Sequence, residues 1–154
     1  MSWNPRENYL IVAFKDGSMS LVDDKGTELM DFDRQGQGIN SLAWIDNMSG
    51  DLITSSPKIG ALKVWNVSHK SPRSTVKVGS TGVKSFQAFP DNPYRFLLAF
   101  RSGAVGIYNL SLKKMEFCTE AGHTETIFDL QFKPDNPNLM ATVSYDGTTK
   151  IWDI

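Results

Sequence analysis

Three residues near the carboxyl terminus are of the types used in nucleophilic catalysis. His123, Ser144 and Asp146 supply an imidazole, a hydroxyl and a carboxylate, the groups of a serine nucleophile with its base and orienting acid. The chain lacks a nucleophile-elbow pattern, a phosphate loop, a dinucleotide fingerprint and zinc-ligand spacing. A structural role, in which the three side chains satisfy one another inside the fold, explains them more simply. We therefore predict no catalytic residue, no cofactor and no metal site, and a protein that is not an enzyme.

The segments that hold these residues repeat four times along the chain. A turn glycine recurs at steps of 43, 43 and 44 residues, and a large apolar residue follows each glycine by five positions. The glycines are Gly17, Gly60, Gly103 and Gly147, and the apolar residues are Val22, Trp65, Tyr108 and Trp152. A period of about 40–45 residues is typical of propeller blades. The sequence thus predicts a single segment, 1–154, with repeats at approximately 1–34, 35–78, 79–121 and 122–154.

Each repeat has the pattern of four β-strands, which we letter a to d in chain order. The b segments are almost continuously apolar, as expected of strands buried on both faces, whereas the a and d segments alternate. The predicted a strands are 39–44, 83–88 and 127–132, the b strands 10–14, 52–56, 96–100 and 139–144, and the d strands 27–32, 74–78 and 114–118. The first repeat is expected to hold only a stub of strand a near Trp3, and the last to end before strand d.

Composition and charge narrow the function classes. Sixteen Lys and Arg residues against seventeen Asp and Glu residues leave a net charge of -1, which argues against bulk attraction to nucleic acid or to a membrane surface. The single cysteine, Cys118, rules out an intramolecular disulfide and suits a reducing compartment. No apolar run approaches the roughly 20 residues of a membrane span, and the amino terminus lacks the apolar region of a secretion signal. We expect a soluble cytoplasmic protein, with the nucleus as the open alternative.

The last repeat resembles the WD-repeat family. It contains the pair Gly122-His123 and the run Ser144-Tyr145-Asp146-Gly147-Thr148-Thr149-Lys150-Ile151-Trp152-Asp153, which has nearly every signature residue of that family. The resemblance implies an all-β propeller, here about four consecutive blades of four-stranded antiparallel sheets that form part of a ring. It also implies a scaffold that binds other proteins or peptides.

The resemblance assigns a structural role to the four polar and aromatic residues of the last repeat. In the family, a histidine before strand a, a serine or threonine ending strand b, an aspartate in the b–c turn and the tryptophan of strand c form a hydrogen-bonded tetrad. The matching residues here are His123, Ser144, Asp146 and Trp152. The other repeats depart from the pattern at Phe14, Val22, Pro57, Ile59, Phe100, Ser102 and Tyr108. We therefore expect apolar packing alone to hold the first three blades.

A series of mainly basic residues precedes the turn glycines. Lys15, Lys58, Arg101 and Tyr145 each stand two residues before the glycine of their repeat. In WD propellers the b–c and d–a loops line one face, so the resemblance places the four side chains near one another. Three cations and a tyrosine suit an acidic or phosphorylated peptide. Two alternatives stay open: exposed turn residues are commonly polar, and a local basic cluster can also bind nucleic acid, against which the overall charge argues.

The number of blades predicts unfilled contacts at both ends of the arc. A blade cannot bury both of its faces alone, so four blades in a row expose two apolar sheet faces. Either a longer protein supplies the remaining blades, which we favour, or two copies meet to close a ring. We expect the chain in isolation to self-associate through its terminal blades.

Overall fold

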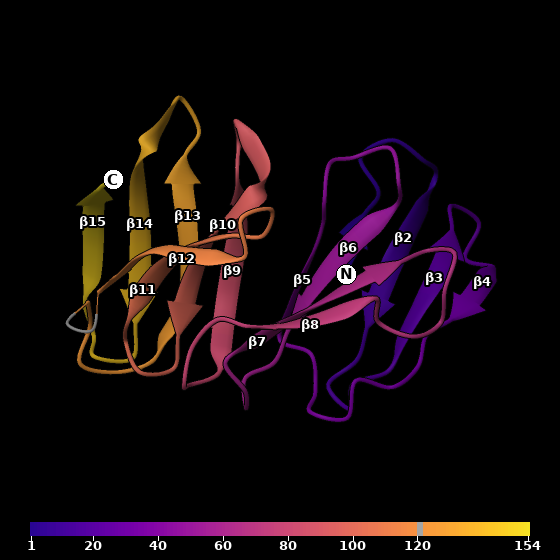
Figure 1. Ribbon diagram of the computed structural model, residues 1–154, viewed down its shortest axis with the longest axis horizontal. Coiled ribbons are helices and arrows are strands. Elements are labelled where there is room, and N and C mark those ends of the chain that lie inside the picture. Colours follow the sequence, from indigo (N-terminus) through magenta and orange to yellow (C-terminus); the bar gives the residue numbers. More distant parts are fainter. Residues whose placement is uncertain (120–121) are drawn as a thin grey trace.

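The computed structural model describes residues 1–119 and 122–154, which form four antiparallel β-sheets and their connections (Figure 1). The sheets lie side by side in chain order, with the β1–β4 sheet at one end and the three-stranded β13–β15 sheet at the other. This arrangement confirms the predicted all-β fold of four consecutive blades. No helix in the described ranges is long and apolar enough to cross a membrane.

The strands of each blade are hydrogen-bonded in the order a, b, c, d. Blade 1 contains β1 (Ser2–Trp3), β2 (Tyr9–Ala13), β3 (Met19–Asp23) and β4 (Glu28–Asp31). Blade 2 contains β5 (Ser41–Trp44), β6 (Asp51–Ser55), β7 (Ala61–Asn66) and β8 (Ser74–Lys77). Blade 3 contains β9 (Val83–Phe89), β10 (Asn92–Phe100), β11 (Val105–Asn109) and β12 (Lys114–Thr119). Blade 4 contains β13 (Ile127–Lys133), β14 (Asn136–Ser144) and β15 (Thr149–Asp153).

The a–b connections of blades 3 and 4 are tighter than the sequence suggested. β10 begins at Asn92, and β14 begins at Asn136, several residues before the predicted strand starts at 96 and 139. Asn92 pairs with Phe89, and Asn136 pairs with Lys133, so only a Pro-Asp dipeptide turns the chain in each case. Proline presets the φ angle that the first position of a turn requires. The repeated Pro-Asp-Asn-Pro tetrapeptide is therefore a hairpin with its turn at the first two residues.

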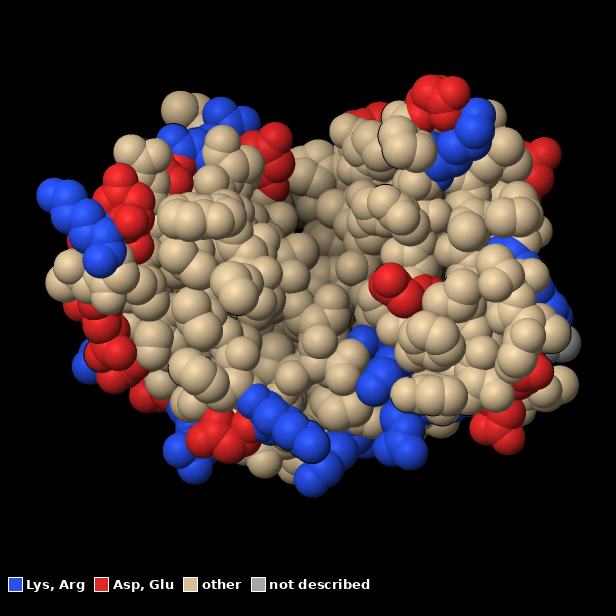
Figure 2. Space-filling view, turned by 180° about the vertical axis from the view of Figure 1, so that it is seen from behind, with Lys and Arg blue, Asp and Glu red and all other residues tan. Residues whose placement is uncertain are grey.

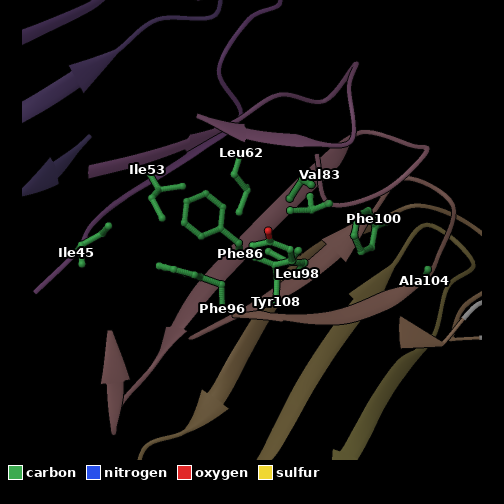
Figure 3. Packing of buried hydrophobic residues seen from close by; sticks show 11 residues of the cluster. Ile45, Ile53, Leu62, Val83, Phe86, Phe96, Leu98, Phe100, Ala104 and Tyr108 are labelled. Atoms are coloured by element: carbon green, nitrogen blue, oxygen red, sulfur yellow. The ribbon is translucent and has the colours of Figure 1, made fainter. Parts of the chain in front are cut away.

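Among the described residues, three apolar clusters hold the blades together, one at each interface between neighbours. Between blades 1 and 2, Ile11 packs in one cluster with Leu52 and Trp65. Between blades 2 and 3, Ile53 packs among Phe86, Phe96 and other side chains of blade 3 (Figure 3). The third cluster joins blades 3 and 4 and is made by Leu97, Ile107, Leu130, Phe132, Met140 and others. Each sheet therefore stabilises its neighbour by burying apolar surface, at about 25 cal/mol per Å².

The same strand positions are left uncovered on blade 4. Ala141 and Ile151 pair across β14 and β15 as Ile53 and Val64 pair across β6 and β7. Ile107, the counterpart of Ile151 in blade 3, is 5% exposed, whereas 69% of Ile151 is exposed. Ala141 and Ile151 help line an apolar hollow of about 340 Å³ on this face. The chain therefore presents an interface of the kind found between its own blades, without a neighbour in the part that the structure describes.

One backbone contact recurs where each d–a loop passes the b–c turn of the preceding blade. The carbonyls of Gly17, Gly60 and Gly103 accept hydrogen bonds from the backbone N–H groups of Gln35, Gly79 and His123, at 2.8, 3.1 and 2.9 Å. Gly103 has a φ of +83°, and a Cβ there would lie 2.1 Å from the carbonyl oxygen of His123. Only glycine allows this close crossing. The contact makes Gln35, Gly79 and His123 equivalent positions in three successive blades.

Candidate functional site

A chain of hydrogen bonds crosses blade 4 from its d–a loop to strand β15. His123, 3% exposed, places Nδ1 2.8 Å from Oδ2 of Asp146 and Nε2 2.8 Å from Oγ1 of Thr142. The indole Nε1 of Trp152 donates to the same Thr142 hydroxyl at 2.8 Å. An indole nitrogen only donates, so the Thr142 hydroxyl accepts from Trp152 and also bonds to Nε2 of His123. An ionised carboxylate only accepts, so Nδ1 of His123 donates its proton to Asp146.

The hydroxyl in this network belongs to Thr142, and the assignment of Ser144 is corrected. Ser144 lies two residues further along β14, and its Oγ donates to the backbone carbonyls of Glu125 and Thr126 at 3.0 and 3.1 Å. It also accepts from the backbone N–H of Asp146 at 3.2 Å. Side chains two residues apart in a strand lie on the same face but at different heights. Trp152 pairs with Met140, and its indole N–H extends to the hydroxyl at position 142. Ser144 therefore ties the b–c turn to the d–a loop.

The residues that resemble a catalytic triad do not form one. The Ser144 hydroxyl is bound to backbone groups, and the hydroxyl beside the imidazole belongs to Thr142, which is 1% exposed. A nucleophile must reach its substrate and must also bond to its base. These side chains instead satisfy buried polar groups.

The Asp146 carboxylate is surrounded by donors. The Thr148 hydroxyl donates to it at 2.6 Å, the Thr148 backbone N–H at 2.9 Å and the Thr124 backbone N–H at 3.2 Å, in addition to His123. These hydrogen bonds, that from the Thr148 side chain first, hold the pKa of Asp146 far below its usual range. Desolvation acts in the opposite direction and raises the pKa of Asp146, but the hydrogen bonds outweigh it. Asp146 is thus ionised and fixes both the b–c turn and the imidazole.

Blade 2 carries a second polar network, which the sequence analysis missed. Nε1 of Trp65 donates to Oγ1 of Thr54 at 2.9 Å, and Thr54 donates to Oε1 of Gln35 at 2.5 Å. Nε2 of Gln35 then donates to the carbonyl of Gly38 at 2.7 Å. A glutamine amide accepts on one side and donates on the other, as the imidazole does, so it can replace His123 without an aspartate. The expectation that apolar packing alone holds this blade is therefore wrong.

A signal for the second network was present in the spacing. Gln35 precedes Gly79 by 44 residues, and Gly79 precedes His123 by 44; Thr54, Leu98 and Thr142 follow the same steps. The turn glycines do not show this 44-residue step between blades 2 and 3, because the b–c turn of blade 2 has one extra residue. Ser55 pairs with Leu62 across it, whereas Val143 pairs with Thr149.

Blade 3 has apolar residues at the matching positions. Gly79 has no side chain to offer, Leu98 replaces the threonine, and Tyr108 replaces the tryptophan. Leu98, Tyr108 and Phe100 are buried in the cluster shared with blade 2 (Figure 3). Burial raises the pKa of the Tyr108 hydroxyl. We call the hydrogen-bonded network around the buried threonine, Thr54 in blade 2 and Thr142 in blade 4, the staple of that blade. In blade 3, aromatic and aliphatic contacts replace the staple.

The basic residues singled out by the sequence lie on the face of the b–c turns and d–a loops. Figure 2 shows Lys and Arg side chains gathered along the lower edge of the molecule, where these loops lie. Lys15 and Lys58 line one hollow of about 390 Å³ together with Lys84, which the sequence analysis did not single out. Asp16, the acidic residue of the lining, forms an ion pair with Arg34 at 3.0 Å. We call this hollow, with Lys15, Lys58 and Lys84, the basic hollow.

The other two members of the series lie on blades 3 and 4. Nη1 of Arg101 is 3.4 Å from the carbonyl of Pro57, the residue before Lys58, so the guanidinium reaches toward the basic hollow. Tyr145 is 70% exposed and packs against Phe128 with ring centroids 5.1 Å apart. Because of the extra residue in its turn, Lys58 is not in strict register with the other three. The structure therefore brings together two of the predicted lysines with Lys84, and Tyr145 belongs to an aromatic pair.

Comparisons with known proteins address the family and the fold. Residues 115–153 match the family model described as WD domain, G-beta repeat. A chain of the mitotic checkpoint complex superposes with a TM-score of 0.82 over 99% of this chain and 46% of the other, at 19% identity. The computationally designed Ika4 protein superposes with a TM-score of 0.76 over 96% of this chain and 86% of that one, also at 19% identity. This chain has the fold of a WD40 β-propeller.

Relatives of similar sequence are proteins of diverse roles. Histone-binding protein MSI1 of Saccharomyces cerevisiae is 28% identical over 99% of this chain. Protein transport protein SEC31 of Yarrowia lipolytica is 28% identical over 75%, and protein SPA1-RELATED 3 of Arabidopsis thaliana is 32% identical over 71%. The chain spans 37%, 10% and 13% of the lengths of these three relatives. The chain thus corresponds to part of proteins whose names carry different roles.

We expect the threonines of both polar networks in the WD40 blades to stabilise the fold. Replacing Thr142 or Thr54 by valine keeps the shape but leaves a buried indole N–H without its acceptor, at a cost of about 1–3 kcal/mol in the free energy of unfolding. Urea denaturation measures this loss. Thr149→Val, at an exposed position of β15, is the control and should change stability by less than about 0.5 kcal/mol. Equal effects at positions 142 and 149 would contradict the network.

The stabilising effect of Asp146 should depend on pH. Its pKa is lowered by folding, so the ionised carboxylate stabilises the fold above the pKa of the unfolded chain, and this contribution falls as the pH drops below about 4. The stability difference between wild type and Asp146→Asn should be constant from pH 7 to pH 5 and shrink between pH 4 and pH 2.5. Urea denaturation at each pH measures it. Asp91→Asn, in an exposed turn, is the control and should show a small difference at every pH; a pH-independent effect at position 146 would count against the ionised role.

Proposed function

We propose that this chain is a non-enzymatic interaction module that binds acidic or phosphorylated segments of partner proteins on the face formed by its b–c turns and d–a loops. The observation that carries the proposal is the basic hollow, where Lys15, Lys58 and Lys84 line one concavity. The WD40 fold supports a scaffold role.

Rigid support favours binding on this face. The d–a loops are fixed to the b–c turns by the recurring glycine hydrogen bonds, and the b–c turn of blade 4 is fixed by Asp146 and Ser144. Loops that are already ordered lose little conformational entropy when a partner binds. Charge-assisted hydrogen bonds from lysine to carboxylate or phosphate then supply affinity. Specificity is set by which side chains the loops present.

We also propose two finer assignments. The stretch 122–142 resembles WD repeat-containing protein 17, and we propose this large propeller protein as a specific relative. The cytoplasm is the proposed compartment, with the nucleus as the alternative, because the single cysteine suits a reducing environment.

The basic hollow should bind an acidic probe in a charge-dependent way. Fluorescein-labelled decaglutamate, titrated with the chain at 150 mM NaCl, should bind, and the double variant Lys58→Glu, Lys84→Glu should bind at least about tenfold more weakly. Fluorescence anisotropy measures the affinity. The control, Lys70→Glu with Lys77→Glu, changes the net charge equally at exposed positions outside the basic hollow and should leave binding within about twofold.

The same titration separates peptide from nucleic acid. Nucleic acid is the alternative partner class, and labelled oligothymidine is its probe. We expect weaker binding than with decaglutamate at 150 mM NaCl, since the net charge is -1 and the cations are local. Tighter binding of oligothymidine, or equal losses in the two double variants, would contradict the proposed function.

We further propose that the isolated chain pairs with a second copy through its uncovered blade faces. The face of Ala141 and Ile151 has the strand positions that are buried between blades elsewhere in the chain. Light scattering across a dilution series should give twice the monomer mass, and Ile151→Asp should shift the chain to monomer. Leu112→Asp is the matched control, because Leu112 is 68% exposed but lies in the turn between β11 and β12. A stable wild-type monomer would overturn this proposal.

A further inference from the structure

A second hollow, of about 300 Å³, lies on blade 3, on the face formed by the b–c turns and d–a loops. It lies between the d–a loop that enters the blade and the blade's own b–c turn. Its lining includes Val78, Gly79, Thr81, Phe100, Ser102 and Ala104. We call it the blade 3 pocket. The polar networks of blades 2 and 4 do not explain it, because blade 3 has no such network.

The blade 3 pocket exists because three side chains are truncated at one place. The positions of His123, Asp146 and Thr148 in blade 4 are taken in blade 3 by Gly79, Ser102 and Ala104, each 44 residues earlier. In blade 4 the three side chains bond to one another, with His123 and Thr148 both on the Asp146 carboxylate at 2.8 and 2.6 Å. Blade 3 has a hydrogen, a hydroxymethyl and a methyl group in the same places. The Phe100 ring takes part of the volume that the staple fills in blade 4, and the pocket opens beside it.

Phe100 forms part of the floor and keeps position 79 small. It occupies the place of Ser144 in blade 4, and a Cβ on Gly79 would lie 2.8 Å from its ring carbon Cε1. Val78 and Ala104 complete an apolar floor, and each is 7% exposed. At the rim, the Thr81 hydroxyl lies 3.3 Å from the Ser102 hydroxyl. The pocket thus combines an apolar floor with a polar rim, which is the usual chemistry of a pocket that receives a side chain.

The walls of the blade 3 pocket are held by backbone hydrogen bonds. The N–H of Gly79 donates to Gly60 O at 3.1 Å, that of Phe100 to Ala104 O at 3.0 Å, and that of Arg101 to Gly82 O at 2.9 Å. Both loops are therefore fixed before any partner arrives. A preformed pocket recovers the free energy of apolar burial without a cost of loop ordering.

The charged groups beside the blade 3 pocket indicate what kind of chain presents that side chain. Arg101 directly precedes Ser102 at the rim, and its guanidinium lies 3.4 Å from the carbonyl of Pro57 beside the basic hollow. A segment that crosses from the basic hollow to the blade 3 pocket therefore meets lysines, then Arg101, then the apolar floor. An acidic segment with one large apolar residue matches this order of groups.

We propose that the blade 3 pocket takes a large apolar side chain, of the size of leucine, methionine or phenylalanine, from the acidic partner segment that the basic hollow binds. The proposal rests on the proposed function for the acidic half of the ligand. By binding one apolar residue of the partner, the pocket distinguishes one acidic segment from another.

Selection from random peptides tests the proposal without a known partner. A phage-displayed library of random 12-residue peptides is selected at 150 mM NaCl on the wild-type chain, on Ser102→Trp and on Ser68→Trp. Ser102→Trp fills the pocket from its exposed rim, and Ser68→Trp places the same side chain in an exposed loop between β7 and β8. Thr81→Trp fills the pocket from the other rim and replaces Ser102→Trp if that variant fails to fold by circular dichroism.

Wild type and Ser68→Trp should enrich peptides in which one large apolar residue stands near a cluster of acidic residues. The filled pocket should remove the apolar preference and keep the acidic one. For the best peptide, changing its apolar residue to glycine should weaken binding to the wild type about tenfold and binding to the filled variant less than about twofold.

The outcomes separate the two proposals. Acidic peptides without an apolar preference, or an apolar preference that survives in the filled variant, overturn the pocket and leave the basic hollow standing. Apolar selection that is lost in the filled variant but shows no acidic preference supports the pocket and contradicts the proposed function. Failure to enrich any peptide overturns both.

Discussion

The described sheets bury apolar side chains against one another, so each blade depends on the blade beside it for the cover of a face. Ile53 and Leu97 are fully buried because the next blade packs on them, and Trp65 is fully buried because the preceding blade does. Burying side chains of this size contributes about 1.5–3 kcal/mol each. The positions of all the loops follow from this packing, because the strands they join cannot slide without uncovering an apolar face.

Polar networks refine that packing rather than replace it. Blades 2 and 4 each connect a buried indole through a threonine to a side chain from the d–a loop, which is glutamine in one case and histidine in the other. Blade 3 makes the same crossing with Gly79 and fills part of the space with Phe100. All three use the same backbone hydrogen bond to a turn glycine. The backbone crossing is thus common to the blades, and the side chains that support it vary.

Because these side chains differ between blades, each blade presents different groups on the face of the b–c turns and d–a loops. Blade 4, whose staple is complete, presents an exposed aromatic pair, Phe128 and Tyr145. The truncated staple of blade 3 leaves a pocket, and the turns of blades 1 and 2 contribute lysines to a shared hollow. A rigid frame therefore presents three different surfaces side by side, which is how a repeated fold acquires selectivity.

The sequence by itself determined the number of blades, the strand order and the b–c turns, because a period of 43–44 residues and alternating hydrophobicity are local properties of the chain. It also located His123, Asp146 and Trp152. The assignment of Ser144 in place of Thr142 was wrong because the hydroxyl that an indole N–H reaches depends on how the two strands pair. The role of Gln35 was missed because the extra residue in the b–c turn of blade 2 shifts the count from the turn glycine. The sequence likewise could not predict that Lys84 lines the basic hollow or that blade 3 has a pocket, because both features form where residues of different blades or loops meet. Only the packing of one sheet on the next decides which of these distant side chains share a hollow.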